Sequence, residues 1–386
     1  MISRKPKIVL NTTTLNQGGV LQRIYSFIDN IVSGTFEEFD WEIFLSARVK
    51  KEIEQRQMEL NVPSRLFPIS PARNVKSRNE IRVALDESRP DLVFTFAGPA
   101  YIKHRWPELM GVADGWVTHS NSVAFKSVPR WSDRWGLKLS SFYKRLWFRR
   151  SSMFVNQTET GKNGIVTRFG AHPENVYIVP NALAAWYEIA DSPTPRQKGE
   201  PLIIFYFSGA YSHKRHDVLP DLAAELKRQG EENFKIWITL PEENPLTKNL
   251  LAKTKTVGVE SHFVNYGRVP VTRGLQLYAK AHICFMPSVL ETFSATYLEA
   301  MATRTPIVAS DFAFAHEICG DAALYVDPDD SIDAARKILE IAGNNLLQSK
   351  LTDVGTQQLK KFPDVPAQME IYRKVLNQAL TAVSKT

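Results

Sequence analysis

The fold of this chain is decided by the stretch PSVLETFSATYLEAMATRTPIVAS, residues 287–310. A short apolar run before it predicts a strand that ends at Met286, and the residues after the turn predict a helix that begins near Ser294. Serine is a favoured N-cap residue, and the first backbone N–H groups of a helix have no partner within the helix. With the positive end of the helix dipole, these groups form a site that accepts an anion such as a diphosphate.

Two glutamates lie in the same stretch. Glu291 falls in the turn after the strand, and Glu299 follows eight positions later, inside the expected helix. A carboxylate only accepts hydrogen bonds, so it can receive two vicinal hydroxyl groups such as those of a ribose. Taken alone, the pair also fits two solvated carboxylates on an exposed helix.

Short β-rich runs alternate with longer helical patterns along the whole chain, and this alternation predicts parallel sheets covered by helices on both faces. The strands expected in the first half are Lys7–Leu10, Trp41–Leu45, Asp91–Phe96, Gly115–His119, Met153–Gln157 and Val176–Pro180. Those expected in the second half are Leu202–Ser208, Lys235–Leu240, His262–Tyr266, Ile283–Pro287, Pro306–Ser310 and Ala323–Asp327.

One segment interrupts the alternation. Residues 189–201 read IADSPTPRQKGEP, and three prolines with a glycine indicate a linker. We therefore expect a first α/β domain at 1–188, a second at 202–364, and a C-terminal helix within 365–386 that packs back toward the first domain. Two facing, doubly wound, Rossmann-like domains create a cleft, and ligands of such sheets bind at the carboxyl ends of the strands.

The composition is that of an ordinary globular protein in a reducing compartment. Neither of the two cysteines, Cys284 and Cys319, lies in a CxxC motif or beside a histidine cluster, which argues against a disulfide framework and a structural zinc site. No apolar run approaches the roughly 18 residues that span a bilayer. The basic N-terminus precedes only a short apolar run, which predicts a first strand and not a signal peptide.

The positive charge is concentrated in the first half. Residues 1–190 hold 26 Lys and Arg against 18 Asp and Glu, although the whole chain has a net charge of only +7.

Residues 128–152, VPRWSDRWGLKLSSFYKRLWFRRSS, hold seven basic residues and one acid among six aromatic ones. This pattern predicts an interfacial helix on an anionic membrane. A packed core helix with solvated cations is the alternative. RNA binding ranks lower because no RRM, KH or zinc-finger pattern accompanies it.

A second basic cluster follows a strand of the second half. Residues 207–217 read FSGAYSHKRHD, and the strand is expected to end near Ser208. Lys214, Arg215 and His216 are expected in the first turn of the next helix, where the dipole disfavours cations. A bound anion would offset that cost. The alternative for Lys214 is a solvated surface charge.

Two features of the first half are expected near the same ligand. Gly18 and Gly19, in LNQGGVLQRI, lie where the first helix begins, and paired glycines permit positive φ and close approach of a backbone N–H. His119 is expected at the end of the Gly115–His119 strand, on the cleft side of the sheet. A histidine there that only bonds to backbone is the alternative.

The whole pattern resembles the large retaining glycosyltransferase family four, of the GT-B fold. The resemblance rests on Glu291 and Glu299 with seven residues between them, and on the run FAHEICGDAALYVDPDD around Glu317. It implies that Glu291 touches the donor sugar, that Glu299 binds the nucleotide ribose, and that His119 contacts the sugar. The remaining residues implied to contact the donor are Gly18, Gly19, Ser208, Lys214, Arg215, Arg268, Thr292, Phe293, Ser294 and Ala295.

The chain departs from the family pattern at two places. The family usually reads Glu-Gly-Phe-Gly where this chain has Glu291-Thr292-Phe293-Ser294, which bears on the identity of the donor sugar. The arginine that the family places after the strand at 202–208 is absent, and Arg215 or Arg268 is the candidate substitute on the diphosphate.

The resemblance implies a retaining transfer that requires no metal. The donor would be a UDP- or GDP-linked sugar, and the acceptor a glycan or lipid-linked glycan at the cytoplasmic face of the membrane, as in cell-surface polysaccharide or lipopolysaccharide assembly. No DxD-type motif lies at an expected strand end. A nucleotide-sugar epimerase on the same architecture and a non-catalytic membrane scaffold are the alternatives. Nucleic acid is not an expected partner.

Overall fold

The computed structural model describes residues 4–16 and 19–383, and they form two compact units. Unit 1 comprises Met1–His119, Leu137–Pro180 and Pro366–Thr386, and unit 2 comprises Ser120–Gly136 and Asn181–Val365. This division differs from a continuous first domain at 1–188, because Ser120–Gly136 groups with the second unit. Side chains of that segment, such as Val123, line a pocket with Tyr211 of unit 2.

Unit 1 is built on a parallel sheet that has seven strands among the described residues, in the order β3-β2-β1-β4-β5-β6-β7. The strands are β1 (Lys7–Asn11), β2 (Asp40–Ser46), β3 (Ser64–Phe67), β4 (Leu92–Thr95), β5 (Glu108–Gly111), β6 (Met153–Asn156) and β7 (Val176–Ile178). The helices are α1 (Val20–Val32), α2 (Ala47–Gln55), α3 (Val75–Ser88), α4 (Gly115–Thr118), α7 (Glu159–Phe169), η1 (Pro173–Asn175) and α15 (Val365–Val383).

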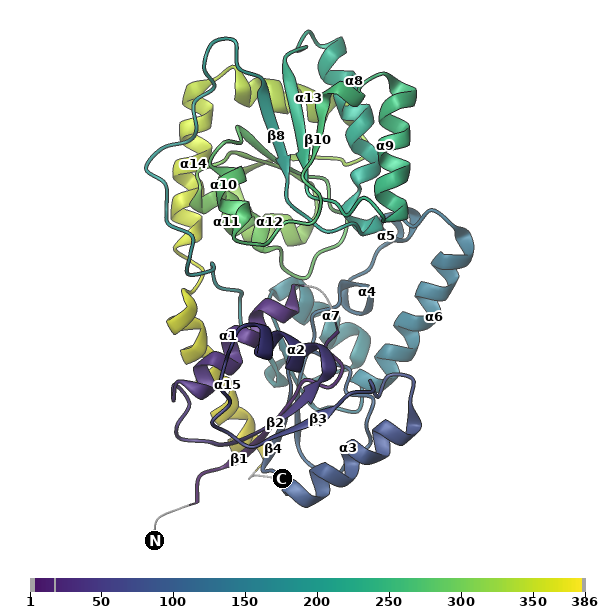
Figure 1. Cartoon of the computed structure of the whole chain (residues 1–386), viewed down its shortest axis with the longest axis vertical. Helices are drawn as coiled ribbons and strands as arrows, with labels where there is room; N and C mark the ends of the chain where they lie inside the picture. Colours follow the sequence, from purple (N-terminus) through teal and green to yellow (C-terminus); the bar gives the residue numbers. More distant parts are fainter. Residues whose placement is uncertain (1–3, 17–18, 384–386) are drawn as a thin grey trace. The chain divides into compact units, whose positions relative to one another are not determined.

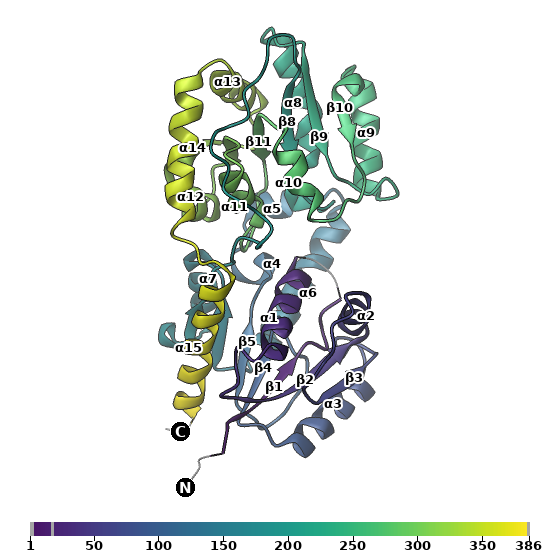
Figure 2. The ribbon, with the colours of Figure 1, turned by 60° about the vertical axis from the view of Figure 1, so that its left-hand side comes forward.

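Unit 2 is built on a second parallel sheet, with six strands among its described residues in the order β10-β9-β8-β11-β12-β13. The strands are β8 (Leu202–Tyr206), β9 (Phe234–Ile238), β10 (Phe263–Asn265), β11 (Ile283–Met286), β12 (Ile307–Ser310) and β13 (Ala323–Val326). The helices are α5 (Ser122–Lys126), η2 (Ser212–Lys214), η3 (His216–Val218), α8 (Leu219–Arg228), α9 (Pro245–Val257), η4 (Glu260–His262), α10 (Arg273–Tyr278), α11 (Ala295–Ala302), α12 (Ala313–Cys319), η5 (Gly320–Ala322), α13 (Ser331–Ala342) and α14 (Asn345–Leu359). Figures 1 and 2 show α9 on one side of this sheet and α14 on the other.

The central strands of both sheets are almost completely buried, as expected for parallel sheets covered on both faces. All residues of β4, β8 and β11 are buried. The C-terminal helix α15 closes the core of unit 1, where the ring centroid of Tyr372 lies 5.0 Å from that of Phe27 on α1. The prediction of two parallel-sheet α/β domains is confirmed.

One strand prediction is wrong. Residues Gly115–His119 do not form a strand, because Asp114 accepts a hydrogen bond from Trp116 N at 3.0 Å and starts the short helix α4. The valine, threonine and tryptophan of this segment favoured a strand in sequence. Helix α7 packs closely on α4, since a Cβ atom added at Gly164 would lie 2.3 Å from the Thr118 carbonyl oxygen.

The strand at this place in the sheet is β5, and its sequence lacks the apolar run that would have predicted a buried strand. It has four residues and begins with a charge, Glu108, whose Oε1 accepts a hydrogen bond from Thr95 Oγ1 at 2.5 Å. The short edge strand β3 was not predicted either. Its residues are mostly accessible, so it shows no apolar run.

Helix α6 (Trp131–Phe148) begins in the segment assigned to unit 2 and ends in unit 1. It covers most of the basic and aromatic stretch 128–152. Among the described residues, no helix is both long and apolar enough to cross a membrane.

Candidate functional site

The carboxyl ends of β8 and β11, which are neighbours in the sheet of unit 2, bring two loops together. The backbone N–H of Val289 donates to the carbonyl oxygen of His213 at 2.8 Å. The hydroxyl of Tyr206 donates to the carbonyl oxygen of Lys214 at 2.9 Å and lies 2.8 Å from the hydroxyl of Ser288. The two segments that carry the sequence motifs, 207–217 and 287–310, are therefore in contact.

This contact places Lys214 beside Glu291. The Nζ atom of Lys214 donates a hydrogen bond to Oε1 of Glu291, and the two side chains are only 13% and 8% exposed. Removing both charges from water has a cost that their attraction must offset. The pair is thus a shielded cation and a shielded carboxylate at the edge of the sheet where ligands of α/β proteins bind.

The helix that follows, α11, begins where the sequence predicted. Ser294 is its N-cap residue and has an extended backbone, but its side chain makes no capping hydrogen bond. The first turn is tied to the neighbouring strand, because Oγ1 of Thr296 donates to the carbonyl oxygen of Phe207 at 3.1 Å. Phe293 is buried against Phe362 at a centroid distance of 5.6 Å, so its ring serves packing. Thr292 is half-buried and Ala295 is exposed.

Glu299 lies inside α11, and its carboxyl group is shielded from water. Its Oε2 atom is buried and makes no hydrogen bond of good geometry among the described residues, and the buried hydroxyl of Tyr187 is close enough to interact with the carboxyl. Burial raises the pKa of Glu299 to about 8, and a hydrogen bond from the Tyr187 hydroxyl lowers it by a smaller amount. Buried polar atoms without partners are rare in proteins and need an explanation, such as a ligand that completes the hydrogen bonds. Glu299 is therefore largely neutral near pH 7 and able both to donate and to accept.

The prediction that Lys214, Arg215 and His216 share the first turn of a helix is wrong. Lys214 ends the short η2 turn, and Arg215 adopts a left-handed conformation with a φ of 56° that interrupts the chain before η3. Helix α8 begins only at Leu219. The three side chains consequently have different surroundings.

His216 is not a cation. Burial, with Lys214 and His213 as lesser causes, lowers the pKa of His216 to about 3. Its Nε2 atom lies 2.8 Å from the hydroxyl of Ser208, and its ring stacks on Tyr206 at a centroid distance of 4.8 Å. Ser208 was predicted to contact the donor, but in this structure its hydroxyl is hydrogen-bonded to the neutral ring of His216.

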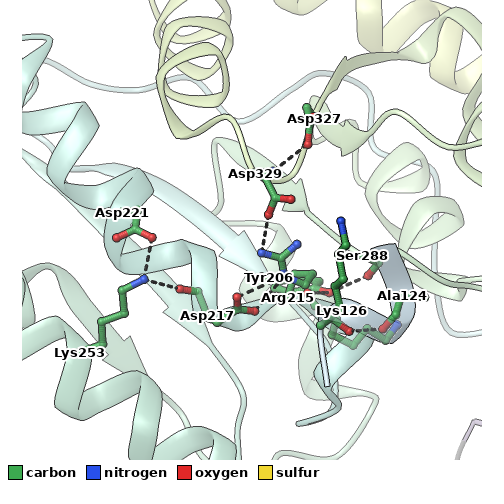
Figure 3. A network of polar contacts seen from close by, with 12 residues as sticks. Ala124, Lys126, Tyr206, Arg215, Asp217, Asp221, Lys253, Ser288, Asp327 and Asp329 are labelled. Carbon is green, nitrogen blue, oxygen red and sulfur yellow. Dashed lines mark hydrogen bonds and ion pairs between the residues drawn. The ribbon is translucent and has the colours of Figure 1, made fainter. Parts of the chain in front are cut away.

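The two candidates for the missing arginine are both paired with acids. Arg215 donates from Nη2 to Asp329 at 2.7 Å and from Nε to Asp217 at 3.1 Å (Figure 3). Arg268 is 79% exposed, and its Nη2 lies 3.7 Å from Glu243. None of these contacts joins either arginine to the Lys214–Glu291 pair. Their role on a diphosphate stays a prediction.

The site residues predicted in unit 1 are only partly described. Gly18 lies outside the described residues. Gly19 is the N-cap of α1 with a φ of −61°, and an added Cβ would meet nothing within 4 Å, so this conformation does not require glycine. His119 is half-buried at the end of α4, and its Nδ1 lies 2.8 Å from Oγ1 of Thr118. The expected strand end at His119 is therefore a helix end.

Sequence reasoning missed two tyrosines of this site. Tyr206 could have been found, because a tyrosine at the carboxyl end of a buried strand places a hydroxyl where loops converge. Tyr187 precedes the linker without any regular pattern, so nothing in the sequence connects it with Glu299.

Three comparisons place this geometry among known proteins. Residues 189–358 match the family described as "Glycosyl transferases group 1". The O-antigen chain mannosyltransferase RfbU of Salmonella typhimurium is 46% identical over 54 residues, 14% of this chain and 15% of the relative. The O-antigen chain mannosyltransferase B of Escherichia coli is 33% identical over 106 residues, 27% of this chain and 28% of the relative. These matched stretches span less than a third of either curated relative.

Solved structures match over nearly the whole chain. The structure of Anabaena Alr3699/HepE in complex with UDP and glucose has a TM-score of 0.71 at 17% identity, covering 97% of this chain and all of the other (100%). WaaG, a glycosyltransferase involved in lipopolysaccharide biosynthesis, has a TM-score of 0.69 at 14% identity, covering 95% of this chain and 99% of the other. At these identities the likeness concerns the fold. The chain has the GT-B fold, and residues 189–358 of its second unit are similar to the group 1 glycosyltransferases.

Proposed function

We propose that this protein transfers a sugar from a nucleotide diphosphate donor to a glycan or lipid-linked acceptor. The observation that carries the proposal is the buried carboxyl of Glu299, whose Oε2 lacks a well-formed hydrogen bond, on the helix that directly follows the loop of the Lys214–Glu291 pair. The UDP complex of the structural relative and the O-antigen mannosyltransferases among the curated relatives support this choice. A UDP- or GDP-linked sugar fits the same set of groups.

Each group then has a role on the donor. The carboxyl of Glu299 exchanges hydrogen bonds with the two ribose hydroxyls, which supplies the partner that Oε2 lacks. The amino end of α11, whose N-cap Ser294 forms no side-chain bond to it, receives the diphosphate. Lys214 changes partner from Glu291 to the phosphate oxygens, and the released Glu291 accepts from sugar hydroxyls.

The transfer is proposed to retain the anomeric configuration. As the bond between the sugar and the diphosphate breaks, negative charge grows on the leaving oxygen, and in this proposal Lys214 and the amino end of α11 stabilise it. A cation and a helix terminus can do this without a metal. Among the described residues, no group of three or more His, Cys, Asp or Glu side chains is placed to hold a metal ion. The role of His119 on the sugar follows from the family resemblance alone.

The acceptor is proposed to be reached at a membrane surface through helix α6. Six large apolar side chains of this helix are exposed: Trp131, Trp135, Leu139, Phe142, Tyr143 and Leu146. Of its aromatic residues only Phe148 is fully buried, which disfavours the alternative of a core helix. The neighbouring Arg and Lys residues favour an anionic leaflet, each adding about 1 kcal/mol near the surface. The cytoplasmic face of the membrane is where nucleotide sugars and such acceptors would meet.

Glu299→Ala is expected to weaken nucleotide-sugar binding at least tenfold, because it removes hydrogen bonds to both ribose hydroxyls, each contributing about 1 kcal/mol. A thermal-shift screen with UDP- and GDP-linked sugars, followed by calorimetry, measures the loss. Glu340→Ala, which removes an exposed glutamate of helix α13, is the matched control. Unchanged affinity in Glu299→Ala would remove the ribose assignment.

Lys214→Met is expected to lower kcat about 10²- to 10³-fold, the usual effect of losing one group that stabilises transition-state charge. The assay follows sugar transfer to a lipid-linked acceptor. Lys248→Met, an exposed lysine on α9, should leave the rate unchanged. Because Lys214→Met leaves Glu291 without its cation, thermal unfolding of this variant and of the double variant with Glu291→Gln checks that the lost activity is not lost folding.

Product analysis separates this function from its nearest alternative. Transfer requires acceptor, so donor incubated alone should stay unchanged apart from slow hydrolysis. Formation of an epimeric nucleotide sugar without acceptor would identify an epimerase and end the transferase proposal.

The membrane proposal predicts the behaviour of a triple variant. Trp131→Ala, Trp135→Ala and Leu139→Ala together should reduce sedimentation with vesicles containing phosphatidylglycerol at least tenfold, because they remove the side chains that insert at headgroup level. Vesicles of phosphatidylcholine alone should bind the wild type weakly, and salt should weaken binding further. The control replaces three exposed apolar residues elsewhere by alanine: Val75, Ile332 and Leu346. Equal loss in the control would speak against a docking helix.

A further inference from the structure

A separate pocket of about 390 Å³ lies within unit 2. Its walls come from α5 and the residues after it, from the loop after β8, from α9, and from Asp329. Lys214, Glu291 and Glu299 do not line it. The volume is within the range of small-molecule sites. The proposed donor site therefore leaves this pocket unexplained.

Arg215 is the most constrained residue of the pocket. It is 8% exposed, and its φ of 56° places a non-glycine residue in the left-handed region. Such a conformation costs about 1 kcal/mol or more and persists where the surrounding structure requires it. Asp217 and Asp329 bind its Nε and Nη2 atoms, whereas no described group accepts a hydrogen bond from Nη1. Figure 3 shows the guanidinium bound to the two acids, and Lys126 lines the same pocket.

Lys126 supplies a cation that the protein does not neutralise. It is the last residue of α5, it is exposed, and no carboxylate of the described residues lies within 4.0 Å of its Nζ. Its backbone position is stabilised, because its carbonyl oxygen accepts a hydrogen bond from Nη2 of Arg134 at 3.0 Å. Lys253 on the opposite wall differs, because its Nζ donates to Asp221 at 2.6 Å. The pocket thus offers one available cation beside already paired charges.

The remaining walls combine an aromatic face with neutral polar groups. Tyr211 is 44% exposed, and its ring stacks on His213 at a centroid distance of 5.6 Å. Asn249 and Ser212 add an amide and a hydroxyl, and Leu246 adds an apolar surface. Amide and carboxylate groups match pairs of hydroxyls, whereas an aromatic ring matches the C–H face of a sugar. With one unpaired cation, this chemistry selects a sugar that carries one negative charge.

We propose that this pocket binds an acidic sugar unit, carrying a carboxylate or a phosphate, of the acceptor glycan. Lys126 pairs with the anionic group, Nη1 of Arg215 and Asn249 bind hydroxyls, and Tyr211 lies against the ring. The assignment of the sugar to an acceptor rests on the proposed transferase function. The binding of an acidic sugar by the pocket does not.

Binding to the full chain is measured by calorimetry with glucuronate, glucose 6-phosphate, glucose and inorganic phosphate as probes. Both acidic sugars should bind at least tenfold more tightly than glucose or phosphate alone. Lys126→Met should reduce their affinity about tenfold and Tyr211→Ala by a similar factor, whereas Lys248→Met on α9 should change nothing. Equal binding of phosphate and the acidic sugars, or affinities unchanged in Lys126→Met, would overturn the proposal.

A second arm tests where the acidic sugar comes from. In the transfer assay, Lys126→Met should raise KM for an acceptor that ends in glucuronate about tenfold and leave KM for a neutral acceptor unchanged. The nucleotide-sugar thermal shift should persist in this variant, so failure of the donor site and failure of the pocket give different results. Equal KM changes for both acceptors, or free glucose 6-phosphate binding without any acceptor effect, would overturn the acceptor assignment.

Discussion

The whole account depends on the pairing of β8 with β11 in the middle of the second sheet. Parallel neighbours end at the same edge, and the backbone bond from Val289 to His213 fixes their two loops at that edge. A lysine from one loop and a glutamate from the other are thereby forced into contact with little water around them. Neither residue would be a site alone. Their position follows from strand order, which is a property of the fold.

Burying the carboxyl of Glu299 costs this unit part of its folding free energy. Folding places Oε2 of this carboxyl group away from water with only the Tyr187 hydroxyl close to the carboxyl, and an incompletely hydrogen-bonded buried group generally costs on the order of 1–3 kcal/mol. The raised pKa of Glu299 is the response to that burial, because the neutral acid is less costly to bury than the anion. A ligand with two adjacent hydroxyls would remove the cost. In the proposed function, this ligand is the ribose of the nucleotide donor.

The sequence predicted the strands with long apolar runs and the residues that belong to a spaced motif. Glu291 and Glu299 were predicted from their spacing within one loop and one helix, and Lys214 from the basic cluster that follows the strand at 202–208. It could not predict the direction of Arg215, because a single left-handed residue turns that side chain toward Asp329, 114 positions away. Sequence patterns also failed to predict the helix at Gly115–Thr118, which a side-chain cap starts. They likewise missed the buried strand at Glu108–Gly111, which begins with a charged residue.

The most direct test is a titration of the Glu299 carboxyl by NMR of protein labelled with ¹³C-glutamate, with the signal assigned by its loss in Glu299→Gln. The account predicts a midpoint near pH 8 in the free protein, as burial requires. Adding UDP should lower this midpoint, because ribose hydroxyls that donate to the carboxylate favour its charged form. A midpoint near the ordinary glutamate value, about 4.3, that UDP leaves unchanged would contradict the account.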